Sequence, residues 1–134
     1  MYKFIFFIVF LLNFPTFSMN ILNYKNPKTN VFGNSWELIT DEVMGGKSKG
    51  DFTIIENDNN FFYRLEGDVS TENNGGFIQF RSDVLIKDQP FRGVRFKVRG
   101  SGDEYFIHIR TSFTFLPRQY YSAKFETQTN WATI

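Results

Sequence analysis

One short segment of the chain resembles a motif with defined chemistry. Gly46-Lys47-Ser48 matches the end of a phosphate-binding loop, in which backbone amides surround a phosphate and a lysine neutralises it. Such a loop needs a glycine five residues before Gly46, but the chain has Asp41 there, whose carboxylate would repel a phosphate. The Gly-x-Gly segment before Tyr105 fails the dinucleotide pattern, because Tyr105 stands where the third glycine belongs. Neither segment predicts nucleotide binding.

Hydrolytic chemistry has candidate residues but no supporting motif. His108 is the single histidine, so a nucleophile–His–acid triad would have to use it, and no nucleophile-elbow sequence is present. Glycoside hydrolysis needs two carboxylates at a defined separation with different pKa values, which a sequence does not show. The carboxylates considered for that pair are Asp41, Asp68, Glu72 and Asp83. We therefore expect a hydrogen-bonded His108 on a sheet face and a protein that is not an enzyme.

Composition excludes several classes of site and partner. The 134 residues include 15 basic and 14 acidic side chains, so the net charge of +1 lacks the basic excess of a nucleic-acid-binding protein. Without cysteine, the chain has no disulfide, no thiolate metal site and no cysteine nucleophile. A single histidine is too few for a multi-histidine metal site. We expect no metal and no cofactor.

The N-terminus has the three parts of a secretory signal. Lys3 precedes an unbroken apolar run over residues 4–12, and Thr16 and Ser18 place small residues before a cut at Met19. The run is short for a membrane span, which needs about 20 residues. We expect export to a periplasm or the cell surface, with a cleaved signal over residues 1–18. An uncleaved N-terminal anchor is the alternative, and it would be the chain's only link to a membrane.

The remaining sequence predicts an all-β domain. Residues 19–35 are polar and broken by Pro27 and Gly33, which favours a linker or N-terminal arm. Residues 36–134 hold about eight strand-like segments spaced by turn residues, which is typical of a β-sandwich or jelly roll. The expected strands span residues 36–40, 51–55, 61–66, 76–81, 93–99, 105–110, 120–126 and 131–134. Only residues 82–89 have a composition that suits a turn of helix.

Two glycine-rich segments, residues 41–48 and 72–77, connect expected strands. In one interpretation they are tight connections, with Asp41 bonding backbone amides in an Asx turn. In the other they are rim loops that contact a ligand or partner. Candidate binding residues are Asp41, Glu42, Met44, Gly45, Gly46, Glu72, Asn73, Gly75 and Gly76. The sequence does not determine whether the two segments share one end of the domain.

The order and spacing of these motifs resemble a known family over residues 36–134. The residues that carry the likeness are Trp36, Asp41-Glu42-Val43-Met44-Gly45-Gly46-Lys47-Ser48, Gly67-Asp68-Val69-Ser70, Glu72-Asn73-Asn74-Gly75-Gly76-Phe77, Phe91-Arg92-Gly93-Val94 and Gly100-Ser101-Gly102-Asp103-Glu104-Tyr105. They look like the complex I intermediate-associated protein 30 family. The resemblance implies a galactose-binding-like β-sandwich and offers no catalytic residues. The chain stops inside an expected strand at Ile134, so we expect the domain to be truncated at its C-terminus.

The resemblance also sets the functional expectation. The family's eukaryotic member is a mitochondrial chaperone that helps assemble respiratory complex I, which implies a non-enzymatic assembly factor acting through protein–protein contacts. The secretory N-terminus differs from a mitochondrial presequence, because it has no arginine. The alternative is a carbohydrate-binding module of the cell envelope. Aromatic rings available to stack on sugars are Trp36, Tyr120, Tyr121 and Trp131.

The signal predicts a defined processing product. When the full chain is made in its own host, the mature protein is expected to begin at Met19, because signal peptidase requires small residues at the −3 and −1 positions. Intact mass and N-terminal sequencing measure this. Ser18→Tyr should block the cut, whereas Ser35→Tyr, outside the signal, should leave it unchanged. A mature protein that keeps residues 1–18 contradicts the prediction and supports the anchor.

Overall fold

The computed structural model describes residues 18–87, 91–116 and 119–134, so nearly all of the predicted signal lies outside it. The chain divides into two compact units, Met1–Phe91 and Arg92–Ile134. The described residues form eight strands, all in antiparallel pairs, and two short 3-10 helices. This confirms the predicted all-β class and is consistent with a sandwich built from antiparallel sheets. Among the described residues, no helix is long and apolar enough to cross a membrane.

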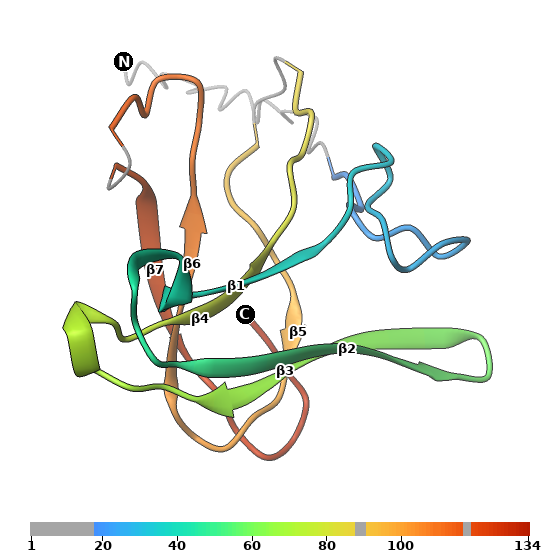
Figure 1. Ribbon diagram of the computed structural model, residues 1–134. Helices are drawn as coiled ribbons and strands as arrows, with labels where there is room; N and C mark the ends of the chain where they lie inside the picture. The colour runs from blue at the N-terminus through green and yellow to red at the C-terminus, as the bar shows by residue number, and fades with distance from the viewer. Residues whose placement is uncertain (1–17, 88–90, 117–118) are drawn as a thin grey trace, which may run out of the picture. The chain divides into compact units, whose positions relative to one another are not determined.

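The first unit contains two strand pairs (Figure 1). Strand β1 (Glu37–Thr40) pairs with β4 (Ile78–Arg81), and β2 (Lys49–Asn57) forms a long hairpin with β3 (Asn60–Asp68). Both hairpin strands are longer than predicted, because the ladder closes around a two-residue turn. Asp58 adopts φ 51° in this turn, a left-handed conformation that short polar side chains tolerate.

An aromatic cluster packs the two strand pairs of the first unit against each other. Phe80 of β4 stacks on Phe52 of β2 with ring centroids 4.7 Å apart, and Trp36 lies 5.2 Å from Tyr63 of β3. Trp36 also contacts Phe80 edge-on at 5.6 Å. Such pairs add about 0.5–1.5 kcal/mol each beyond the area they remove from water. The aromatic strand residues therefore act first as packing groups, and Trp36 belongs to this cluster.

Residues 19–35 form turns that are hydrogen-bonded to the rest of the first unit. Asn30 is fully buried, and its amide donates to the Ser82 hydroxyl at 2.9 Å and the Asp83 carbonyl at 2.6 Å. The Tyr63 hydroxyl donates to the Pro27 carbonyl at 2.8 Å, and burial raises the pKa of Tyr63 above its usual 10.0. All three bonds join the segment to residues far along the chain.

The second unit also contains two strand pairs. Strand β6 (Glu104–Ile109) pairs along its length with β7 (Tyr121–Glu126), and β5 (Lys97–Val98) pairs with β8 (Ala132–Thr133). The strand predicted over residues 105–110 is confirmed as β6, in which Tyr105 stacks on Phe125 while Phe106 and His108 contact each other on the other face.

Two sequence predictions differ from the structure. The strand predicted over residues 93–99 is reduced to β5, although Phe96 also exchanges backbone hydrogen bonds with Ile134. A strand requires a hydrogen-bonded neighbour, and alternation of side chains does not supply one. The turn of helix considered for residues 82–89 is absent from residues 82–87, and residues 88–89 lie outside the described chain. Ser82 instead bonds Asn30, an alternative to helical hydrogen bonding.

Candidate functional site

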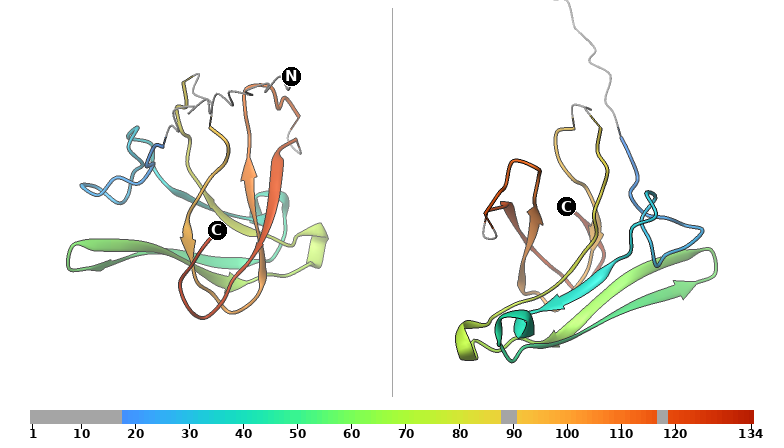
Figure 2. Two further views of the ribbon diagram at one scale, coloured as in Figure 1. Left: turned by 180° about the vertical axis from the view of Figure 1, so that it is seen from behind. Right: turned by 45° about the horizontal axis from the view of Figure 1, so that its top comes forward.

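The two glycine-rich segments lie together at one end of the first unit. The first forms a 3-10 helix, η1 (Asp41–Met44), between β1 and β2, and the second forms η2 (Glu72–Asn74) between β3 and β4. Figures 1 and 2 show both short helices at the end of the long hairpin opposite its turn. We call residues 41–48 and 72–77 the glycine-loop end. The structure thus shows that the two segments share one end of the first unit, which the sequence did not determine.

Asp41 holds the glycine-loop end together. Its side chain is 0% exposed, although a buried carboxylate is unfavourable unless hydrogen bonds replace the lost water. Ser48 donates its backbone N–H to Oδ1 at 2.9 Å and its hydroxyl to Oδ2 at 2.5 Å. Gly76 and Phe77 donate backbone N–H groups to Oδ2 at 2.5 Å and 3.4 Å. One carboxylate therefore accepts hydrogen bonds from both loops.

These donors stabilise the charged form of Asp41. Burial alone raises the pKa of Asp41, but the hydrogen bonds from Ser48, Gly76 and Phe77 outweigh it and bring the pKa below its usual 3.8. The side chain is therefore ionised at neutral pH. Its acceptor sites are directed at the protein's own amides and hydroxyl, so Asp41 acts as a structural anion.

Ser48 extends the network to the end of β3. Its hydroxyl is fully buried, donates to Asp41 and accepts the backbone N–H of Ser70 at 2.9 Å. A hydroxyl can donate once while accepting, so both roles are compatible. Ser48 was not among the predicted site residues, although it closes the motif that begins at Asp41. Its position at the end of that motif is the feature by which the sequence could have identified it as a site residue.

The four glycines of the glycine-loop end are needed for two physical reasons. A Cβ on Gly46 would lie 2.3 Å from the Asp41 Cγ, and a Cβ on Gly75 would lie 2.3 Å from the Asp41 Oδ2. These two glycines leave room for the carboxylate. Gly45 and Gly76 have φ of 84° and 134°, which side-chain-bearing residues rarely adopt. The four glycines predicted as site residues therefore shape the loops around Asp41.

The local Asx turn expected for Asp41 is wrong. The carboxylate does bond backbone amides, but they belong to residues 48, 76 and 77, well beyond a local turn. The mistaken expectation assumed that a loop aspartate bonds its own neighbours, as it does in most turns. Here donors from the far end of its own loop and from the second loop provide more hydrogen bonds than a local turn would.

The outer residues of the glycine-loop end face solvent. Asn73, in the left-handed conformation with φ 56°, donates its side-chain amide to the Gly45 carbonyl at 3.1 Å. Lys47 and Glu72 form an exposed ion pair across the two loops, an interaction that contributes little in water. Val43 and Met44 are 73% and 59% exposed at the tip of η1. A rigid, hydrogen-bonded base therefore presents two apolar side chains to solvent.

A shallow hollow lies beside this tip. Its volume is about 500 Å³, within the range of small-molecule and peptide pockets. The lining residues come from β1, η1 and the start of β2: Leu38, Ile39, Thr40, Glu42, Val43, Lys49 and Gly50. Of the predicted site residues, Glu42 lines the hollow, whereas Asp41 and Met44 are not among its lining residues.

The remaining chemical candidates lie elsewhere. His108 on β6 stacks on the Tyr120 ring with centroids 4.1 Å apart. Within the described residues, no three histidine, aspartate or glutamate side chains are grouped as a metal would require. Asp83 accepts hydrogen bonds through its backbone carbonyl from Asn30 and Asn34.

Comparison with known proteins gives one match. The model of the family described as Complex I intermediate-associated protein 30 (CIA30) matches residues 23–134. The match includes all eight strands and both loops of the glycine-loop end. No curated protein and no solved structure matches the chain.

The network predicts a pH-dependent role for Asp41 in stability. Asp41→Asn is expected to lower the midpoint of thermal unfolding by about 10 °C at pH 7, because an amide donor would replace a charged acceptor. The folded pKa of Asp41 is lowered, so its contribution is complete above about pH 4 and is lost as the pH falls through the folded value. Calorimetry from pH 7 to acid should show the difference from wild type shrinking. Asp51→Asn, at an exposed position, is the control, and a pH-independent difference would contradict the assignment.

The close approach at Gly75 predicts a steric penalty. Gly75→Ala is expected to destabilise the fold by about 1–3 kcal/mol, because its Cβ would overlap the Asp41 carboxylate. Gly93→Ala is the matched control, since nothing lies within 4 Å of its Cβ position. Urea unfolding measures both variants. Equal stability of the two would show that the loops do not close tightly on Asp41.

Proposed function

The chain belongs to the complex I intermediate-associated protein 30 family, and we propose that it is a non-enzymatic binding and assembly factor that acts through protein–protein contact at the glycine-loop end. Family membership over most of the chain supports an assembly role. The family's description names an intermediate of complex I, so subunits of a respiratory complex are the first candidate partners. We also propose that the protein acts after export, on the cell-envelope side of the membrane.

The observation that carries the proposal is the exposed pair Val43 and Met44 on a fixed base. Exposed apolar side chains that cluster beside a hollow are typical of interaction surfaces, and methionine is enriched in them. The network of Asp41 and Ser48 fixes the loop before a partner arrives, so less conformational entropy is lost on binding. An apolar segment of a partner protein is the occupant that fits this tip.

The charged side chains at the hollow would orient the partner protein. Glu42 and Lys49 carry opposite charges, both line the hollow, and both are exposed. Exposed charges at a rim influence the association rate and the orientation of a partner more than its affinity. The expected partner segment is therefore apolar and carries charged residues that can pair with Glu42 and Lys49.

The test is co-purification from the native host. The tagged full chain, expressed at its natural level, would be recovered from gently solubilised membranes, and bound proteins would be quantified by mass spectrometry. Val43→Ser together with Met44→Ser should reduce recovery of respiratory-complex subunits about tenfold, the effect of losing an interface hot spot. Leu85→Ser is the matched control, because Leu85 is 66% exposed but lies on neither glycine loop.

Two outcomes would overturn the proposal. One is the absence of any enriched respiratory-complex subunit with the wild-type chain. The other is equal recovery with the wild type and the Val43/Met44 variant, which would remove the glycine-loop end as the contact surface. Circular dichroism of each variant separates loss of the contact from loss of the fold.

A further inference from the structure

Strand β6 has a hydrogen-bonded neighbour on one side only. It pairs with β7 along its length, and no described residue outside β7 exchanges a backbone hydrogen bond with it. The Thr127 N–H donates to the Asp103 carbonyl one step beyond this ladder, so these two residues form a hydrogen-bonded pair. Such pairs alternate with non-hydrogen-bonded pairs in an antiparallel ladder. The even-numbered residues of β6 therefore direct their backbone N–H and C=O groups away from β7.

The outer edge of β6 lacks the features that usually protect an exposed edge strand. Such strands carry charges or a proline, because an open edge can pair with another chain. Residues 105–109 include no lysine, arginine, aspartate, glutamate or proline. Phe106 is 57% exposed and Ile109 is 42% exposed, so apolar side chains of this strand reach solvent. The open edge of β6 is therefore suited to receive a further strand.

The sequence at this edge is self-complementary in an antiparallel arrangement. Residues 104–110 are Glu-Tyr-Phe-Ile-His-Ile-Arg, so a two-fold axis at Ile107 places Glu104 opposite Arg110 of a second copy. The other pairs across this axis are Tyr105 with Ile109 and Phe106 with His108. Opposite charges and pairs that include an aromatic ring are favourable between adjacent strands. The side chains of β6 thus match those of a second β6.

The two charges at the ends of this segment can both take part. Arg110 is exposed and forms no ion pair with a described residue. Glu104 pairs with Lys124 of β7 through Oε1, which leaves Oε2 for a guanidinium. A two-fold axis creates the pair of Glu104 with Arg110 twice, once at each end of the contact.

The backbone favours the same register independently of the side chains. Outward-directed groups of one copy must meet outward-directed groups of the other, and these belong to even-numbered residues. The axis at Ile107 satisfies this, because it pairs Phe106 with His108. A shift of one residue would pair even with odd residues and lose the hydrogen bonds. A shift of two residues would keep the hydrogen bonds but separate Glu104 from Arg110.

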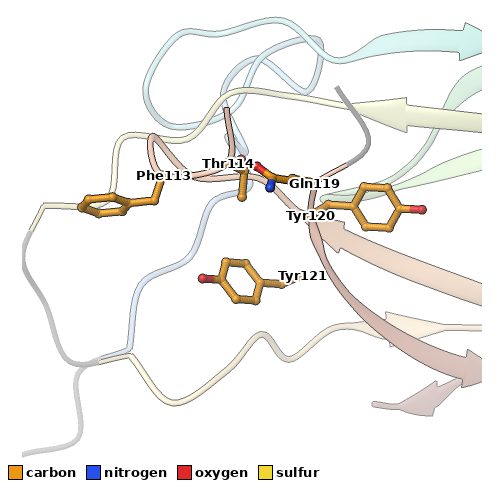
Figure 3. A pocket seen from close by; sticks show the side chains of 5 residues that line it. All are labelled: Phe113, Thr114, Gln119, Tyr120 and Tyr121. Atoms are coloured by element: carbon orange, nitrogen blue, oxygen red, sulfur yellow. The ribbon is translucent and has the colours of Figure 1, made fainter. Parts of the chain in front are cut away.

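The two faces of the hairpin are already sorted, so each would continue across the axis. Ile109 pairs with Tyr121 in the ladder, and the Tyr120 ring stacks on His108 with centroids 4.1 Å apart. Figure 3 shows the Tyr120 and Tyr121 rings pointing in opposite directions where β7 begins. Opposed residues in neighbouring strands share a face. Joining two copies would therefore extend an apolar face that contains Ile107 and Ile109.

We propose that β6 pairs with β6 of a second copy of this chain, antiparallel about a two-fold axis at Ile107. The two β6–β7 hairpins then form one four-stranded sheet. The contact uses no residue of the glycine-loop end, so it does not depend on the proposed function. One strand edge per copy buries less than the roughly 1,200 Å² of a stable interface, so the dimer should dissociate in the micromolar range.

Single cysteines test the register, because the chain has none of its own. Ile107 would face its counterpart in a non-hydrogen-bonded pair, where Cα atoms lie about 4.5 Å apart, within the range of a disulfide. Ile107→Cys, in the purified full chain under mild oxidation, is expected to form a disulfide-linked dimer on a non-reducing gel. A mixture of Tyr105→Cys and Ile109→Cys should form mixed dimers faster than either variant forms dimers alone.

The partner strand offers a matched control for this cross-link. Ala123 lies directly opposite Ile107 on β7 and is exposed, but it would be distant from the axis. Ala123→Cys should therefore cross-link at least about tenfold more slowly than Ile107→Cys. Equal rates for the two variants, or mixed dimers no faster than dimers of Tyr105→Cys and Ile109→Cys alone, would overturn the register.

Sedimentation measures the association without a cross-link. The wild type should self-associate reversibly, and Arg110→Glu should weaken the dimer about fivefold, because it places like charges opposite each other at both ends. Arg92→Glu makes the same charge change at an exposed position outside β6 and should leave the association unchanged. A wild type that stays monomeric at about 1 mM, or equal weakening by the two substitutions, would overturn the proposal.

Discussion

A single buried carboxylate organises the first unit of this protein. The four buried side chains among the described residues are all polar, and Asp41 is the only charged one. A charge in that position requires compensating donors, which here come from residues 48, 76 and 77. The end of β1, the start of β2 and the entry to β4 must therefore meet at one point. The glycines at positions 46 and 75 follow from the space that the carboxylate occupies.

The hydrogen bonding of the buried Asp41 carboxylate also explains how a loop tip can be both rigid and apolar. A loop that carries Val43 and Met44 in water has no core to hold it, so its shape depends on hydrogen bonds at its base. Asp41 and Ser48 supply those bonds from beneath. In the second unit, the Thr114 N–H bonds the Thr111 carbonyl just after β6, and His108 stacks on Tyr120 just before β7.

Local pattern predicted the strands well where the partner strand is a sequence neighbour. The long hairpin of β2 and β3 and the alternation in β6 both belong to antiparallel pairs joined by one loop. Prediction was also good for the remote pair of β1 and β4, and it was poorer where the partner strand is short. The segment at residues 93–99 alternates cleanly, yet only Lys97–Val98 is assigned as strand, because its partner β8 is a short strand far along the chain. The alternation of apolar residues shows which face of a strand is apolar, but not which other strand lies beside it to form hydrogen bonds.

By itself, the sequence determined the all-β class, the positions of the two glycine loops and the family, because turn residues, alternation and a spaced motif are local features. It also named Asp41 and the four glycines as special. Only the tertiary structure decided that the two loops share an end and that Asp41 is buried rather than presented to a ligand. It also decided that Val43 and Met44 are exposed at the tip of η1. The physical reason is that burial and long-range hydrogen bonds depend on which distant segments meet, as Asp41 and Gly76 do across 35 positions.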